Sequence, residues 1–216
     1  LDLARAVPHL ALYDIAYYIS FTEEGAAAAA AYGLEQLAET PPFKVFALPE
    51  SSLVDVAAYE PAVWTGEGSF KDAALDWFDD VTRLDRWVVA DGPDGWPRIG
   101  SIQPGDARER ISSAGEVSDV VLEAHRISFH TTAVGVPHLV KVSYFPNWQA
   151  TGAEGPYRAA PSLMVVVPTT EDVVIEFRNT PPENAGMLLS AAGVAATGAL
   201  FFLGRRRRRR AIGGQA

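Results

Sequence analysis

The pattern of hydrophobic and polar positions changes character twice along this chain of 216 residues. In the first part, apolar residues recur at three- and four-residue steps over Asp2–Leu12 and over Ser69–Asp80, which predicts two amphipathic helices. An acidic, alanine-rich run predicts a third helix, because Thr22 can cap its start and Gly33 can end it. The strands that we expect between and after these helices are Ile15–Phe21, Phe43–Leu48, Leu53–Tyr59 and Arg86–Ala90.

Residues 91–113 break this pattern. The breakers in Asp91–Pro97 and the polar run Pro104–Arg110 predict a linker or long loop. Short alternating runs separated by turn residues follow, and they are typical of an antiparallel β-sandwich or small barrel. These runs are Val117–Glu123, His125–Thr131, Leu139–Phe145, Ser162–Val167 and Asp172–Arg178. We therefore expect an α+β protein, with a small α/β subdomain at 1–90 before a β-sandwich subdomain at 114–180.

The last hydrophobic segment, Met187–Leu203, holds no charged residue. As a helix it would be about 26 Å long, close to the thickness of a bilayer's hydrocarbon core. It predicts a transmembrane helix at 184–204 and a basic tail at 205–216. A helix buried in a soluble protein is the alternative, but a block of arginines has no natural place in a soluble core. That block consists of Arg205, Arg206, Arg207, Arg208, Arg209 and Arg210.

The arginine block also predicts an orientation in the membrane. Arginines are costly to move across a bilayer, so we expect the tail to stay in the cytoplasm and the body to lie outside, in a bacterial cell membrane. Gly193 and Thr197 lie four residues apart with alanines beside them, which favours close packing against other transmembrane helices. No signal peptide is visible at the start of the sequence. We therefore expect the chain to be the C-terminal piece of a longer membrane protein.

Composition and charge exclude several kinds of function. The net charge is −9, and without the arginine block 12 basic residues face 27 acidic ones, a balance of −15. A body this acidic argues against a nucleic-acid partner. The chain has no cysteine, which excludes disulfides, thiolate nucleophiles and cysteine zinc sites. Metal-ligand spacing is absent from the four histidines, so we expect no metal and no other cofactor; they are His9, His125, His130 and His138.

Three blocks near the end of the body, VKVSYFPNW at Val140–Trp148, GPYR at Gly155–Arg158 and PSLMVVVP at Pro161–Pro168, resemble a segment of large bacterial multi-pass membrane proteins. These proteins are labelled 6-pyruvoyl-tetrahydropterin synthase-related and are similar to membrane glycosyltransferases of the GT-C type. The resemblance implies an extracytoplasmic C-terminal region closed by a last transmembrane helix. It also implies that the catalytic carboxylates lie on early loops of the parent protein, so this chain itself is expected to be non-catalytic.

Two groups of side chains are candidates for a site. Tyr144, Trp148, Tyr157 and Arg158 could form a ligand surface, because aromatic rings stack on sugars and arginine binds phosphate or carboxylate. The alternative is a structural corner at YFPNW, in which Tyr144 and Trp148 pack beneath the turn. Four aspartates could bind calcium or act as acid and base, although such clusters are more often a solvated helix face; they are Asp72, Asp76, Asp79 and Asp80.

Two functions follow from these observations. The first is the outer module of a glycosyltransferase-like protein in cell-envelope polysaccharide or glycolipid assembly, which would contact an envelope glycan or a lipid-linked sugar. The second is a non-enzymatic scaffold, tethered to the membrane, that binds a glycan or a protein.

Overall fold

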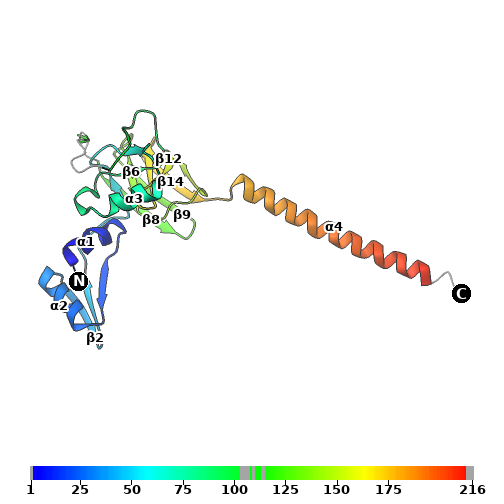
Figure 1. Cartoon of the computed structure of the whole chain (residues 1–216), viewed down its shortest axis with the longest axis horizontal. Helices are drawn as coiled ribbons and strands as arrows, with labels where there is room; N and C mark the ends of the chain where they lie inside the picture. The colour runs from blue at the N-terminus through cyan, green and yellow to red at the C-terminus, as the bar shows by residue number, and fades with distance from the viewer. Residues whose placement is uncertain (1, 103–107, 109, 113–114, 213–216) are drawn as a thin grey trace. The chain divides into compact units, whose positions relative to one another are not determined.

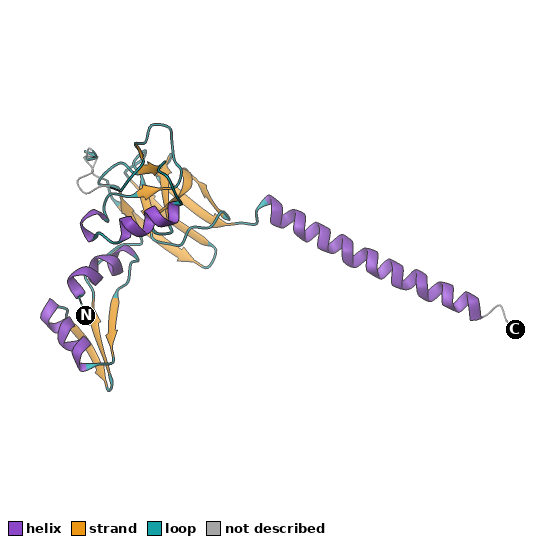
Figure 2. Cartoon of the chain, viewed as in Figure 1, coloured by secondary structure: helices purple, strands orange, loops and turns teal. Residues whose placement is uncertain are grey.

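A computed structural model describes residues 2–102, 108, 110–112 and 115–212, and over 202–212 it describes the backbone (Figure 1). The chain divides into two compact units, Leu1–Phe177 and Arg178–Ala216. The described strands form three sheets, so the expected α+β class with a β-sandwich is confirmed (Figure 2). The helices are α1 Leu3–Leu12, α2 Glu23–Tyr32, α3 Phe70–Phe78, the short 3₁₀ helix η1 Val81–Arg83, and α4 Pro181–Ile212.

Residues 2–50 form a small α/β layer that is shorter than the α/β subdomain expected at 1–90, because β4 (Val54–Val56), β5 (Ala62–Trp64) and β6 (Val88–Val89) belong to another sheet. Its sheet has the order β1-β3-β2, with β1 at Tyr17–Ser20, β2 at Gln36–Thr40 and β3 at Phe43–Ala47. The Thr22 hydroxyl accepts a hydrogen bond from the Gly25 amide at 3.1 Å and so caps α2. The helix ends at Gly33, whose φ of 93° suits glycine. The buried core of this layer consists of Leu3, Val7, Ala26, Ala29, Phe46 and Leu48.

A seven-stranded sheet forms the centre of the body, in the order β4-β10-β13-β12-β6-β5-β7. Its pairs are antiparallel, except that β5 runs parallel to β6 and β7. Strand β13 alternates between two cores on opposite faces of the sheet, since Leu163 and Val165 belong to one core and Met164 and Val166 to the other. The strand bounds are β4 Val54–Val56, β5 Ala62–Trp64, β6 Val88–Val89, β7 Arg98–Ile99, β10 His138–Val140, β12 Ala153–Ala159 and β13 Leu163–Pro168.

This sheet joins regions that the sequence assigns to separate subdomains. Strands from both sides of residues 91–113 belong to it, and β7 lies inside the expected linker. Trp96, in the same stretch, is buried in the first core. A two-residue strand is too short to produce an alternating pattern, which is why the sequence indicates only a loop here. The range 91–113 therefore does not separate two sheets; its residues 103–107, 109 and 113–114 lie outside the described residues.

A four-stranded sheet with the order β11-β14-β9-β8 completes the sandwich. Ile127, Phe129 and Ile175 of this sheet share the second core with Val140 and Met164 of the seven-stranded sheet. The first core lies on the other face of the seven-stranded sheet and includes Trp77 of α3. The remaining bounds are β8 Val117–Glu123, β9 Arg126–Thr131, β11 Trp148–Thr151 and β14 Asp172–Phe177.

Among the described residues, α4 is the one helix that is long and apolar enough to cross a membrane, and its candidate span is Pro181–Phe201. None of this span is buried; Leu188, for example, is 73% exposed. The described part of the chain therefore has one candidate membrane-spanning helix, a feature of membrane-associated proteins. The helical backbone continues beyond the expected end at 204 as far as Ile212. Arginine is a good helix former, so the basic tail does not stop the helix.

Candidate functional site

The body contains a cavity of about 830 Å³ where the end of α1, β4, β8 and β10 meet. Apolar side chains such as Leu12, Val54 and Leu139 form part of its wall. Its polar wall consists of Glu50, Ser51, Ser52, Asp55, Asp85 and Lys141. Of these, Lys141 is buried, Asp55 is half-buried and the other four are exposed, so the cavity has a polar mouth and a buried cation.

Lys141 is the buried cation, and three elements hold it in place. It follows directly after β10, and its amide donates to the Leu53 carbonyl at 2.9 Å. Its side chain is 4% exposed, and the Nζ lies 2.9 Å from Asp55 Oδ2. The Nζ also donates to the Ala11 carbonyl at 2.9 Å. Ala11 lies in the last turn of α1, where the helix dipole is negative, so carbonyl and carboxylate together offset the desolvation of the ammonium group.

Two serine hydroxyls continue this polar network. Ser52 Oγ donates to Asp55 Oδ1 at 2.6 Å, and Ser51 Oγ donates to Asp14 Oδ1 at 2.6 Å. Both oxygens of Asp55 are therefore occupied, one by Lys141 and one by Ser52. Each Asp55 oxygen thus has one fixed partner and a second lone pair that can accept a hydrogen bond from a ligand. The network therefore provides oriented acceptors for binding.

The charge of the cavity selects among ligands. Among the described residues that line the cavity, Glu50, Asp55 and Asp85 supply three carboxylates against the one ammonium of Lys141, which leaves a net charge of −2. Anionic ligands such as phosphates would be repelled, whereas an uncharged ligand rich in hydroxyl groups could donate to the exposed carboxylates at the mouth. Among the residues that the structure describes, no cluster of three histidine, aspartate or glutamate side chains could hold a metal ion.

The four residues expected to form a ligand surface are divided between two cores. Tyr144 and Trp148 pack in or against the second core, and Trp148 is 9% exposed, with its Nε1 donating to the Ser143 carbonyl at 3.2 Å. Tyr157 packs against the first core beside Trp96, with ring centres 5.4 Å apart. Burial raises the pKa of the Tyr157 phenol. The guanidinium of Arg158 lies 5.4 Å from the centre of the Phe70 ring. The aromatic side chains thus pack at two different cores, and the packing of Trp148 is consistent with the structural-corner interpretation of YFPNW.

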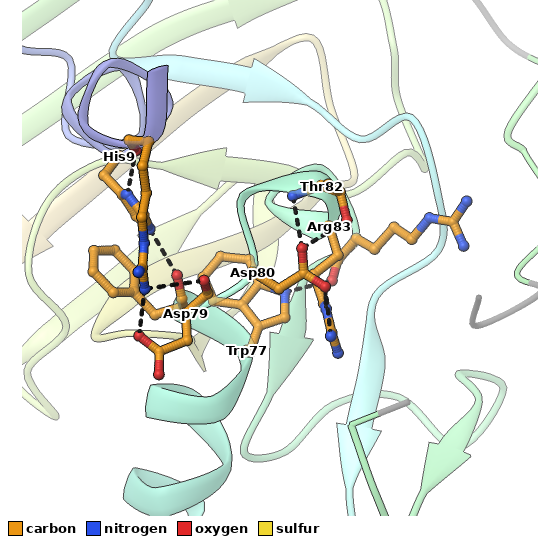
Figure 3. Close-up of polar contacts among 9 residues, drawn as sticks. His9, Trp77, Asp79, Asp80, Thr82 and Arg83 are labelled. Carbon is orange, nitrogen blue, oxygen red and sulfur yellow. Dashed lines mark hydrogen bonds and ion pairs between the residues drawn. The ribbon is translucent and has the colours of Figure 1, made fainter. Parts of the chain in front are cut away.

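Three of the four aspartates on and after α3 have structural contacts, and Figure 3 shows those of Asp79 and Asp80. Asp80 accepts from the Thr82 hydroxyl and amide at 2.6 and 3.0 Å and pairs with Arg83 at 2.6 Å. The hydrogen bonds from Thr82, followed by that from Arg83, lower the pKa of Asp80 to about 2. Asp72 accepts from the Ser69 hydroxyl at 2.7 Å at the start of the helix. Asp79 pairs with Arg5 of α1 at 3.0 Å.

The histidines also have separate structural contacts. His9 lies between α1 and α3, with Nε2 2.6 Å from the Phe78 carbonyl (Figure 3). His130 pairs with Asp172 at 3.0 Å, and the hydrogen bond to this carboxylate raises the His130 pKa. His138 is fully buried between the Val136 carbonyl and the Thr131 hydroxyl, and burial lowers its pKa. His125 stacks loosely near Phe177, with ring centres 6.1 Å apart.

The cavity around Lys141 is the site that sequence reasoning missed. The alternating pattern of Leu139–Phe145 places Lys141 on one face of an expected strand, but it does not indicate which group would pair with the lysine. A lysine inside an otherwise apolar strand is a signal that could have marked it, because such a residue needs a buried partner. Its partners come from Ala11 and Asp55, far away in the sequence.

Comparisons with known proteins gave no match: no family model, no curated protein and no solved structure matches the chain.

Proposed function

We propose that this chain is a membrane-anchored binding module whose body lies outside the cytoplasm and whose cavity binds an uncharged glycan. In this proposal it serves cell-envelope polysaccharide or glycolipid assembly, as the resemblance to GT-C glycosyltransferases implies, and the catalytic carboxylates of that machinery lie elsewhere. The observation that carries the proposal is α4, an apolar helix with exposed side chains that runs directly into six arginines.

The physics of α4 supports an anchor. If the helix stayed in solution, the exposed side chains of Leu188, Val194 and Leu200 would be in contact with water. This exposure costs about 25 cal/mol of free energy per Å² of apolar surface. Hydrocarbon removes that cost, while an arginine at the bilayer centre costs about 2.5–3.5 kcal/mol. Gly193 has no side chain, so another transmembrane helix could pack closely against α4 at this turn. The Thr197 hydroxyl donates to the Gly193 carbonyl at 2.8 Å, which satisfies its hydrogen-bonding capacity inside the helix.

The cavity supports binding of an uncharged glycan over an anionic sugar donor. The carboxylates of Glu50 and Asp85 line the cavity and are exposed. They can accept hydrogen bonds from the uncharged hydroxyl groups of a sugar. The net charge of the cavity disfavours the phosphate of a lipid-linked or nucleotide-linked sugar. A lipid-linked sugar would therefore present its glycan portion to the cavity and keep its phosphate outside.

Sided thiol labelling tests the anchor and its orientation, because the chain has no cysteine of its own. We expect Thr65→Cys, an exposed position in the body, to react with a membrane-impermeant maleimide on intact spheroplasts. Gln215→Cys in the tail should react only after permeabilisation, since the arginines hold the tail inside. The parent chain without cysteine is the control. Labelling of Gln215→Cys on intact spheroplasts, or recovery of the protein in the soluble fraction, contradicts the proposal.

Binding of the full chain in detergent to immobilised oligosaccharides tests the cavity. The probes are uncharged pentose and hexose oligomers and their phosphorylated counterparts. We expect the double substitution Glu50→Gln and Asp85→Asn to weaken binding of an uncharged oligomer by about tenfold or more, because hydrogen bonds to charged groups contribute about 1.5–3 kcal/mol. Glu24→Gln, an exposed change on α2, should leave binding unchanged. Preference for phosphorylated probes, or no binding of any uncharged probe, contradicts the assignment.

A further inference from the structure

Exposed aromatic side chains gather at one end of the four-stranded sheet. Phe145 is 55% exposed and Phe177 is 37% exposed, and their ring centres are 6.3 Å apart. Trp148 lies beneath them, edge-on to Phe177 with centres 5.2 Å apart. His125 lies beside Phe177 in the turn between β8 and β9. We call these four residues the aromatic rim.

Strand pairing fixes the rim at a single end of the sheet. Phe177 is the last residue of β14 and is paired with Trp148, the first residue of β11. The Phe177 amide donates to the His125 carbonyl at 2.9 Å. The rim is therefore built on three neighbouring strands that are anchored in the second core through Trp148. Its position relative to the end of β14 is fixed by the fold.

The chain leaves the body at the rim and enters α4 almost at once. Only residues 178–180 separate Phe177 from Pro181, where the helix begins. Glu183 accepts from the Thr180 amide and hydroxyl at 2.6 and 2.8 Å, which caps the helix and keeps this connection short. Four extended residues span at most about 14 Å. The covalent connection alone therefore keeps Phe177 within that distance of the first residue of α4.

We propose that the aromatic rim inserts into the phospholipid headgroup layer and holds the body against the bilayer surface. The inference rests on the proposed function, because it requires α4 to span the membrane. The interfacial layer is about 5–7 Å thick on each side, and a connection of three residues leaves Phe177 within reach of it. Phe and Trp side chains are common on the apolar faces of interfacial segments, which bury them at the boundary between headgroups and acyl chains. The exposure of Phe145 and Phe177, which has no role within the body, is explained by this contact.

Lipid-borne quenchers test the proposal on the full chain reconstituted into phosphatidylcholine vesicles. Single cysteines carrying an environment-sensitive fluorophore are placed at Phe145→Cys and, as a second rim position, His125→Cys. Val134→Cys is the matched control, because it is 45% exposed but follows the other end of β9, about 17 Å along the strand. Val194→Cys reports on α4 itself. We expect a headgroup spin label to quench both rim positions at least threefold more than position 134.

The outcomes separate this inference from the anchor. Quenching of the label at 194 by a mid-chain spin label, together with rim labels quenched no more than position 134, overturns the inference and leaves the anchor intact. Absence of quenching at 194 overturns the anchor itself. Strong quenching at 194, 145 and 125 with weak quenching at 134 supports both.

Discussion

Replacing Trp77 by alanine is expected to lower the free energy of unfolding by about 3–5 kcal/mol, the usual cost of truncating a buried tryptophan. Trp77 is 1% exposed and lies in the first core. Its Nε1 donates to the Arg86 carbonyl at 2.9 Å (Figure 3). That carbonyl also accepts from Arg108, so most of the loss should come from packing rather than from an unsatisfied acceptor. Urea titration of the full chain in detergent micelles, followed by near-ultraviolet circular dichroism, measures the change.

Leu75→Ala supplies the control for Trp77. Leu75 lies on the same helix but is 52% exposed, so its truncation should change stability by no more than about 0.5 kcal/mol. Equal effects of the two substitutions would mean that α3 does not pack through Trp77, and the described first core would be incorrect.

Trp148→Ala is the second substitution with a large expected effect, again about 3–5 kcal/mol of unfolding free energy. The side chain is nearly buried in the second core, contacts the Phe177 ring and donates to the Ser143 carbonyl. Phe145→Ala, three positions earlier in the same motif, is the matched control: its 55% exposure predicts a change within about 1 kcal/mol. The same urea titration measures both variants.

This comparison also decides between the two interpretations of the YFPNW motif. A structural corner predicts that Trp148→Ala destabilises the body. If the substitution left stability unchanged and abolished oligosaccharide binding, the ligand-surface interpretation would replace the corner and the cavity would lose its role.

Local features of the fold could be predicted from sequence because their causes are local. The cap at Thr22, the end of α2 at Gly33 and the start of α3 after Ser69 depend on hydrogen bonds within a few residues. Strand β13 could be recognised as doubly covered because every position along it is apolar.

Non-local features could not be predicted in the same way. Strand β4 pairs with β10, which places Val54 opposite Val140, and two-residue strands such as β6 and β7 leave no periodic pattern. The cavity has the same cause. Lys141 can be buried because its ammonium group contacts the Ala11 carbonyl and the Asp55 carboxylate. These partners are distant in the sequence and come close to Lys141 only when the chain folds. The aspartates near α3 are the opposite case, because they are close in sequence but do not share one site. Asp72 accepts a hydrogen bond at the start of α3, and Asp80 accepts hydrogen bonds at the start of η1.

The pairing of β4 with β10 has a consequence for biogenesis. The strands of the N-terminal layer have their partners close in the sequence, but β4 must wait for β10, about 80 residues later. The last of the sandwich strands, β14, ends at Phe177, and α4 begins at Pro181. All described strands of the body are therefore synthesised before the apolar helix leaves the ribosome, so the body can begin to close while α4 is still being made.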